Sequence, residues 1–163
     1  MKILIAHAGK SGTTEKCAKL LREKLPGAVL ADLNRETPEI EAYDAIVIGG
    51  SIRMGQLHKK AKAFLLQNAA GLRAKKAAYF ICCGTAESAP QLFETNFAKE
   101  LLAGAVSYEC FGGEMNIDRL HGMDKFIAKM VSKSPDGQKA APHILEENIT
   151  KLAQAVQKAA QSA

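Results

Sequence analysis

Short apolar runs alternate with segments of helical periodicity along the chain. Five runs of apolar and small residues are bounded by glycine, proline or polar positions, and each run predicts a buried strand. The third run is expected to end at Gly49 and Gly50. The predicted strands cover residues 3–6, 28–33, 45–48, 77–83 and 106–111.

Helical spacing fills the intervals between these runs. A first helix is expected to follow a capping Thr13 or Thr14 and to end at Pro26 and Gly27. Further helices are predicted over residues 59–68, 92–102 and 142–159, and the last of them carries an apolar stripe.

This alternation of apolar strands with helices predicts an α/β fold, a parallel sheet covered by helices on both faces. With right-handed crossovers, five strands in the order 2-1-3-4-5 form a doubly wound sheet, whose ligand lies beyond the carboxyl ends of the strands. The length of 163 residues suits a single domain, residues 1–163. The segment of about 112–141 does not fit the alternation and is interpreted as a helical insertion after the fifth strand.

The loop between the first strand and the first helix gives the strongest local signal for chemistry. Its glycines bend the backbone so that several N–H groups point at one spot, and the following helix adds its positive end. The hydroxyl groups and the lysine complete a candidate site for a dianionic phosphate. The residues of this loop are Gly9, Lys10, Ser11, Gly12, Thr13 and Thr14.

Two other phosphate motifs are excluded by spacing. A P-loop requires a glycine where Leu4 stands, ahead of Gly9, Lys10 and Ser11. A dinucleotide-binding fingerprint requires G-x-G-x-x-G, which this loop does not supply. The remaining alternative is a tight strand-to-helix turn with an ordinary capping threonine.

Composition and charge limit the kinds of partner and the cellular compartment that we expect for this protein. The net charge of +5 and the pI near 9.0 indicate an anionic partner, such as a phosphate ligand or a membrane surface. Nucleic acid is disfavoured because the basic residues are scattered and no aromatic residues are interleaved with them. The chain has neither an apolar run of bilayer length nor a signal-peptide pattern, so a cytoplasmic location is expected.

The four cysteines show no C-x-x-C spacing, and three of them lie in apolar segments. We interpret them as small packing residues in a reducing compartment and expect no metal site. The alternative is a redox or metal role. The cysteines are Cys17, Cys82, Cys83 and Cys110.

With the first loop and residues 43–58 in view, the chain resembles the flavodoxin superfamily. More narrowly, it is similar to the branch that contains the short, FMN-dependent, menaquinone-linked protoporphyrinogen oxidases of bacteria. The first loop is similar to the flavodoxin phosphate loop, Ser/Thr-x-Thr-Gly-x-Thr: Gly12 and Thr14 match, Ser11 replaces a threonine, and Gly9 lacks the first hydroxyl. The resemblance spans nearly the whole chain and implies a flavodoxin-like fold with FMN as the cofactor.

The resemblance also implies two loops along the flavin ring and two catalytic candidates. The chain has no Trp, and Met54 is expected to pack on the ring where ordinary flavodoxins use aromatic residues. Arg53 is expected to lie near the flavin or a carboxylate-bearing substrate, and His58 to transfer a proton; the alternatives are a surface arginine and a helix-start histidine. The expected ring contacts are Ser51, Ile52, Arg53, Met54 and Gly55 in the second loop, and Cys83, Gly84, Thr85 and Ala86 in the third.

Within the insertion, residues 118–133 predict an amphipathic helix. Apolar residues share one side, and Lys125, Lys129 and Lys133 recur on the other. A basic amphipathic helix can lie on an anionic membrane, and the resemblance implies an inserted segment linked to quinone and membrane. The alternative is a helix packed on its own domain with solvated lysines.

Three functions follow from these patterns. The first is an FMN-dependent oxidoreductase that takes electrons from an organic substrate, protoporphyrinogen by resemblance, and passes them to a quinone. The second is an electron carrier that serves a redox partner protein, and the third is a binding module without flavin. A phosphorelay receiver is disfavoured, because the first strand ends in Ala6, His7 and Ala8 rather than in an acidic pair.

Overall fold

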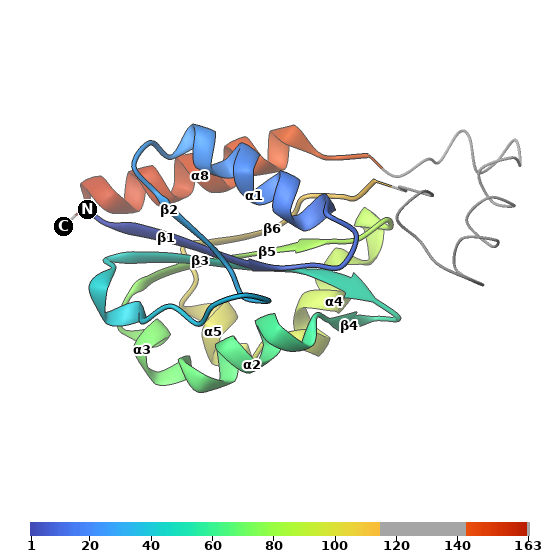
Figure 1. Cartoon of the computed structure of the whole chain (residues 1–163), viewed down its shortest axis with the longest axis horizontal. Coiled ribbons are helices and arrows are strands. Elements are labelled where there is room, and N and C mark those ends of the chain that lie inside the picture. Colours follow the sequence, from blue (N-terminus) through green and yellow to red (C-terminus); the bar gives the residue numbers. More distant parts are fainter. Residues whose placement is uncertain (115–142, 163) are drawn as a thin grey trace, which may run out of the picture.

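A parallel sheet organises the part of the chain that this computed structural model describes, residues 1–114 and 143–162 (Figure 1). Its strands follow the order β2-β1-β3-β5-β6, and a short β4 pairs antiparallel with β3. Because β4 only extends a hairpin, this is the predicted 2-1-3-4-5 order, and the doubly wound α/β fold is confirmed. The strands are β1 (Ile3–Ala8), β2 (Val29–Asp32), β3 (Ala45–Arg53), β4 (Gln56–Leu57), β5 (Lys76–Cys82) and β6 (Ser107–Cys110).

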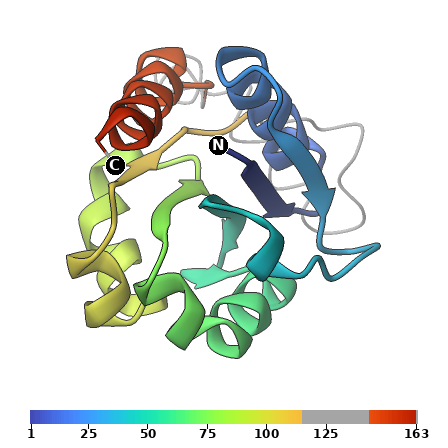
Figure 2. The ribbon, with the colours of Figure 1, turned by 90° about the vertical axis from the view of Figure 1, so that its left-hand side faces the viewer.

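Helices cover both faces of this sheet (Figure 2). One face carries α1 (Thr13–Lys24) and α8 (Glu146–Gln161), which contact each other. The other face carries α2 (Lys59–Gln67), α3 (Ala69–Arg73), α4 (Ala89–Asn96) and α5 (Lys99–Ala103). Two short 3-10 turns, η1 (Ile40–Ala42) and η2 (Ala86–Ser88), complete the connections.

The strands are apolar on both faces because successive side chains enter two different cores. Ile5, Val47 and Phe80 share one core with residues of α1 and α8. Ile46 and Tyr79 belong to the other core, beneath α2 to α5. All five of these side chains are buried, which explains the short uninterrupted apolar runs in the sequence.

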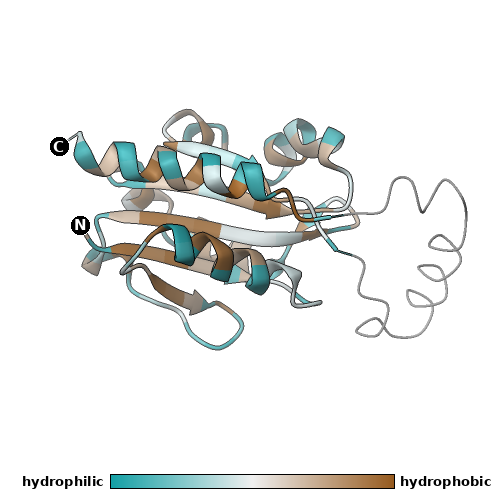
Figure 3. Ribbon diagram, turned by 90° about the horizontal axis from the view of Figure 1, so that it is seen from above, coloured by the Kyte–Doolittle hydropathy of each residue, from teal (hydrophilic) through white to brown (hydrophobic). Residues whose placement is uncertain are grey.

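The amphipathic pattern of the last helix appears directly in the structure. Apolar and polar residues alternate along its ribbon (Figure 3), and the residues that it buries are Ile149, Leu152, Ala153 and Val156. The predicted start at residue 142 was too early, because α8 begins at Glu146. The residues before it pair instead: Ile144 bridges Gly112, and the N–H of Leu145 donates to the carbonyl of Phe111 at 2.9 Å.

The prediction that the third strand ends at Gly49 and Gly50 was wrong. β3 runs through both glycines to Arg53. A Cβ atom at Gly49 would lie 2.1 Å from the ring of Phe80, and one at Gly50 would lie 2.9 Å from the Cδ1 atom of Leu57. These glycines therefore allow close packing inside the sheet rather than ending the strand.

The predicted helix over residues 92–102 is two helices, α4 and α5. The backbone turns extended at Phe97, with φ −120° and ψ 139°. This conformation lets the Phe97 ring pack against the rings of Tyr79 and Phe93, with centroid separations of 5.3 and 5.2 Å. Burial of an aromatic ring outweighs the continuity of one helix.

The predicted amphipathic helix over residues 118–133 lies outside the described residues, as does most of the insertion. Among the helices that the structure does describe, none is both long and apolar enough to cross a bilayer.

Candidate functional site

The parallel register brings three loops to the carboxyl edge of the sheet. His7 pairs with Gly49, Ala8 with Gly50, and Ser51 with Cys82. The chain leaves β1, β3 and β5 just beyond these pairs, so the segments that follow lie side by side at this edge (Figure 1). In a doubly wound sheet this edge is where ligands bind.

The first loop ends in a left-handed glycine that starts α1. Gly12 has a φ of +89°, and its carbonyl accepts the N–H of Lys16 at 3.0 Å. Gly12 therefore occupies the N-cap position without a side-chain bond, and the prediction that Thr13 or Thr14 caps the helix was wrong. A glycine adopts this conformation without the steric cost that a Cβ atom brings. The N–H groups of the first turn, residues 13–15, precede the hydrogen-bond ladder of the helix and point toward the loop.

Thr14 is the buried member of this loop. Its side chain is 1% exposed, and its Oγ1 would lie 2.6 Å from a Cβ atom at Gly9. Its hydroxyl also hydrogen-bonds to the thiol of Cys82. Gly9 therefore lacks a side chain because Thr14 fills the space, and the two positions pack as a unit. The contact of Thr14 with a phosphate remains a prediction.

Asn34 anchors the first loop and was missed by sequence reasoning. Its Nδ2 donates to the carbonyl of Gly9 at 3.1 Å, while its N–H donates to Oδ1 of Asp32 at 2.9 Å. The N–H of Leu33 bonds to the carbonyl of His7 at 2.8 Å, which fixes the segment after β2. The available signal was an Asx residue directly after a strand that ends at the ligand edge.

Charge around the first loop is largely paired. Lys19 holds the carboxylate of Glu15 at 2.9 Å and lowers its pKa through a hydrogen bond and its charge. Lys16 pairs with Glu114 at 2.6 Å. Both pairs are exposed to solvent, so each contributes little stability. At the loop, Lys19 offsets the negative charge of Glu15, which would otherwise repel an anion, while the charge of Lys16 is matched by Glu114.

A polar hollow of about 160 Å³ flanks the loop on the β2 side. His7 forms part of its wall and is 2% exposed; burial lowers its pKa below the usual value, although Asp32 acts in the opposite direction. A neutral imidazole therefore stands beneath the loop at neutral pH. The hollow is lined by His7, Gly9, Lys10, Gly12, Glu15, Asp32 and Asn34.

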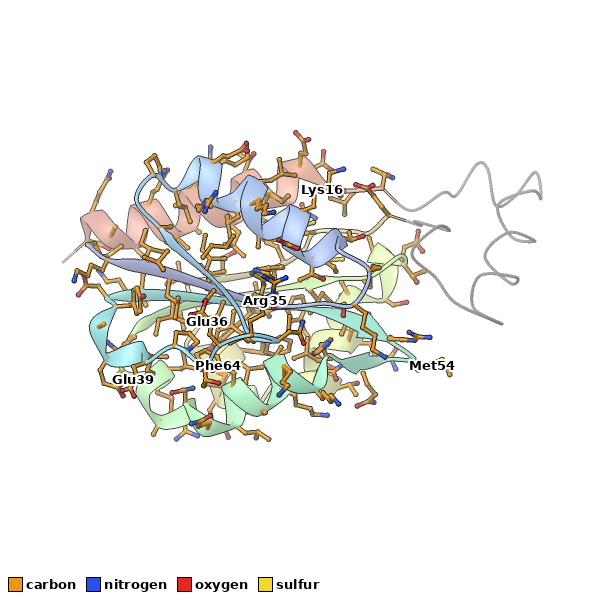
Figure 4. The ribbon with its side chains drawn as sticks, viewed as in Figure 1. Lys16, Arg35, Glu36, Glu39, Met54 and Phe64 are labelled. Atoms are coloured by element: carbon orange, nitrogen blue, oxygen red, sulfur yellow. The ribbon has the colours of Figure 1, made fainter. Side chains whose placement is uncertain are left out.

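The second loop is a tight hairpin between β3 and β4. Met54 and Gly55 have φ values of +54° and +74°, and positive φ at both central residues is the signature of a two-residue type I′ turn. The N–H of His58 closes the hairpin by donating to the carbonyl of Ser51 at 2.9 Å. Met54 is 92% exposed and extends from the tip of the hairpin, away from the body of the protein (Figure 4).

Asn96 holds this hairpin against α4 and was also missed by sequence reasoning. It is 7% exposed, and its Oδ1 accepts the N–H of Leu57 at 2.8 Å. Its Nδ2 donates to the carbonyls of Gly55 and Leu92 at 3.0 and 2.9 Å. One buried amide thus ties three backbone groups together. A side-chain amide can accept and donate several hydrogen bonds, but the sequence did not indicate which backbone groups Asn96 would bond.

His58 caps α2. Its Nδ1 accepts the N–H of Lys60 at 3.1 Å, which requires that nitrogen to be unprotonated. Burial lowers the pKa of His58, and the charges of Lys10 and Lys59 act in the same direction. The catalytic role expected for His58 remains a prediction beside this capping role.

The third loop leaves β5 at Cys83 and is held from the β6 side. The N–H of Cys83 donates to the carbonyl of Gly112 at 2.9 Å. Cys83 is buried, whereas Gly84, Thr85 and Ala86 are exposed. The loop therefore offers an accessible backbone next to the hairpin.

All four cysteines are buried and unbridged, in two close pairs on opposite faces of the sheet. Within the described residues, no group of three or more His, Cys, Asp or Glu side chains could hold a metal ion.

The strand order and the three loops at one edge define a doubly wound α/β protein of flavodoxin type. The family model described as flavodoxin domain matches residues 4–141, and the chain belongs to this family. A curated relative, protoporphyrinogen IX dehydrogenase [quinone] of Escherichia coli strain K12, is 26% identical over 151 residues, which are 85% of this chain and 82% of the relative.

Solved structures share the fold at low sequence identity. The flavodoxin WrbA-like protein from Agrobacterium tumefaciens gives a TM-score of 0.55 at 15% identity, covering 96% of this chain and 98% of that one. A flavoprotein from Lactobacillus acidophilus NCFM, solved in complex with FMN, gives a TM-score of 0.50 at 18% identity, covering 67% and 92%.

Proposed function

We propose that the chain is an FMN-dependent oxidoreductase of flavodoxin type. The observation that carries this proposal is the meeting of three loops at the carboxyl edge, each held there by hydrogen bonds. Family membership and the FMN-bound structural relative support the same cofactor.

The residues of the first loop fit a phosphate group. Gly12 supplies the left-handed turn, and the N–H groups that start α1 have no acceptor within the helix. Lys10 is exposed beside them, and the carboxylate of Glu15 is paired with Lys19. In this proposal Gly9, Lys10, Ser11, Gly12, Thr13 and Thr14 hold the phosphate.

The other two loops are assigned to the flavin ring. When bound, FMN supplies the hydride and electron transfer chemistry. Arg53 and His58 are proposed to face the substrate, Arg53 as a fork of donors for a carboxylate and His58 as a proton carrier. The proposed ring contacts are Ser51, Ile52, Arg53, Met54 and Gly55 with Cys83, Gly84, Thr85 and Ala86.

The relative from E. coli supports protoporphyrinogen IX as electron donor and a quinone as acceptor. The propionate carboxylates of such a donor match the charge of Arg53. A cytoplasmic location with peripheral contact to the membrane through residues 118–133 is part of this proposal, since quinones reside in membranes.

Electron transfer to a partner protein, without an organic substrate, is the second candidate. Membership of the flavodoxin domain family favours it. It differs from the first candidate in one expected result: the flavin is reduced by a reductase but not by protoporphyrinogen IX.

Anaerobic mixing of the FMN-loaded protein with protoporphyrinogen IX and a menaquinone analogue tests the proposal. We expect flavin absorbance to bleach with the first and return with the second. Arg53→Met should lower kcat/KM by about tenfold, the cost of one charge-assisted hydrogen bond, and leave FMN affinity unchanged. Arg73→Met, at the end of α3, is the matched control. A purified protein that takes up no FMN contradicts the proposal, and bound FMN that stays oxidised favours the electron carrier.

A further inference from the structure

Two thiols from the ends of neighbouring strands lie in contact. Cys83 follows β5 directly and Cys110 is the last residue of β6, and their Sγ atoms are 3.4 Å apart. Both side chains belong to the same buried core. Backbone bonds hold the two segments together: Phe111 donates to Ile81, and Cys83 donates to Gly112, each at 2.9 Å.

The surroundings of Cys110 favour its thiolate. The N–H of Gly112 donates to the Cys110 sulfur at 3.4 Å, and when Cys110 is a thiolate the thiol of Cys83, also 3.4 Å away, donates to it as well. These bonds lower the pKa of Cys110 to about 7, against the opposing effect of burial. The thiolate is the form of cysteine that reacts with oxidants.

A small oxidant has a route to this sulfur. Cys110 lines a groove of about 330 Å³ between α4 and the start of α8, and Phe93, Tyr108 and Asn148 form part of its walls. Cys110 itself is 5% exposed and Cys83 is 8% exposed. Cys110 borders this groove and Cys83 does not, so a molecule the size of hydrogen peroxide in the groove lies next to Cys110.

We propose that Cys83 and Cys110 form a reversible disulfide when hydrogen peroxide oxidises the protein. The thiolate of Cys110 attacks one peroxide oxygen, the O–O bond breaks, and the other oxygen leaves as water after taking up a proton. Cys110 is then a sulfenic acid. The sulfur of Cys83 attacks it, the S–O bond breaks, and a second water leaves with the proton of Cys83. Two electrons pass from the thiols to the peroxide, and a dithiol reductant reverses the reaction by exchange.

The disulfide between Cys83 and Cys110 is expected to change the third loop. The two sulfurs must close from 3.4 Å to about 2.05 Å, the length of a disulfide. The thiol of Cys83 carries a single proton, and the carbonyl of Thr85, 3.6 Å away, accepts it when the Cys110 sulfur does not; a disulfide sulfur has no proton to donate. Oxidation therefore removes one bond that shapes residues 84–86. An effect on FMN affinity rests on the proposed function, whereas the disulfide itself does not.

Peptide mapping of the full chain tests the disulfide. The protein is treated with hydrogen peroxide, blocked with N-ethylmaleimide and digested with trypsin. We expect a link between residues 77–99 and 100–119 that dithiothreitol removes. Because Cys82 and Cys83 share the first peptide, the Cys82→Ser variant is expected to keep the link, while Cys83→Ser and Cys110→Ser lose it.

The second thiol pair is the matched comparison. Cys17 and Cys82 also hydrogen-bond, but they lie in the core beneath α1 and α8. This bond, together with burial, raises the pKa of Cys82 well above its usual value. We expect this pair to stay reduced under the same treatment. The proposal is overturned if Cys83 and Cys110 remain thiols, if Cys17 and Cys82 link instead, or if Cys110 is converted to a sulfinic acid without a link.

The FMN readout separates the two proposals. We expect the oxidised protein to bind FMN several-fold more weakly than the reduced protein, and Cys110→Ser to show no such change. Unaltered affinity in a protein whose link is complete contradicts the effect on the third loop. A chain that forms the link but binds no FMN in either state supports the disulfide and contradicts the proposed function.

Discussion

Single residues at the carboxyl edge have both a structural role and a proposed functional role. For Gly12 the two roles can be distinguished by comparison with Gly27. Its φ of +89° costs an alanine about 1 kcal/mol or more. Gly27 has nearly the same φ, +86°, with open space around it, at the opposite end of α1. Both positions therefore carry a similar conformational cost, but only Gly12 borders the proposed phosphate site.

We expect Gly12→Ala and Gly27→Ala to lower the free energy of unfolding by similar amounts, about 1 kcal/mol. Gly12→Ala should also weaken FMN binding by about tenfold, because the N–H groups of a strained loop no longer point together at the phosphate. Chemical denaturation and calorimetric titration measure the two effects. Equal FMN affinity in both variants would contradict the assignment of the first loop.

His58 links stability to pH. Its pKa in the folded protein is lowered from 6.5, so the unfolded chain binds the proton more readily. The stabilising contribution of neutral His58 is full above about pH 6.5 and is lost as pH falls below it. His7, whose pKa is also lowered, adds to the same trend.

Unfolding by urea between pH 8 and pH 5.5 measures this dependence. His58→Asn should keep the α2 cap, since an asparagine oxygen accepts the same N–H, and should flatten the decline in stability. The decline that remains is expected from His7. A variant as pH-sensitive as the wild type would show that His58 titrates normally.

At the scale of elements, the hairpin of β3 and β4 depends on one buried side chain from α4. Removing the amide of Asn96 leaves the N–H of Leu57 unpaired in a buried place. We expect Asn96→Ala to reduce the free energy of unfolding by about 1–3 kcal/mol and to weaken FMN binding. Asn68→Ala, which removes a single helix-end bond to Phe64 far from the loops, is the control. If Asn96→Ala loses stability but binds FMN normally, the hairpin does not depend on this contact for its proposed role.

The elements also show where prediction from sequence ends. The strand order was predictable because apolar runs and helical spacing report burial, which is local in the sequence. The roles of Gly49 and Gly50 were not, since they depend on the Phe80 ring and on Leu57, which lie across the sheet and across the hairpin. The split between α4 and α5 depends likewise on the contact of Phe97 with Tyr79.

The candidate site likewise contains residues that the sequence could predict and residues that it could not. Residues 9–14 were recognisable because glycines and hydroxyls in a strand-to-helix loop carry a local signal. Asn34 and Asn96 were missed because their partners, Gly9 and Leu57, are distant in sequence. The close approach of Cys83 and Cys110 likewise depends on the pairing of β5 with β6.

At the scale of the whole molecule, the two segments that flank the insertion lie next to each other. Gly112 bridges Ile144, and the N–H of Gly113 donates to the carbonyl of His143 at 3.2 Å. The two flanks are thus adjacent, and a short turn is enough to join them. Replacing residues 115–142 with a Gly-Asn-Gly linker should leave the melting temperature within a few degrees and preserve FMN binding.

The same deletion tests the predicted membrane contact of residues 118–133. The full chain should sediment with vesicles that contain anionic lipid, and less so at high salt, because screening weakens the attraction of lysines to the surface. The shortened chain should stay in the supernatant. Equal sedimentation of both chains would place any membrane contact elsewhere.

The termini of the described chain lie at the amino edge of the sheet, opposite the three loops (Figure 1). There the ammonium group of Lys76 donates to the carbonyls of Ala159 and Ser162 and anchors the end of α8. A tether fused to Met1 therefore emerges on the far side from the candidate redox edge. Immobilised through that tether on a gold electrode, the protein would present its loops to the solution, an orientation suited to voltammetry with soluble electron donors.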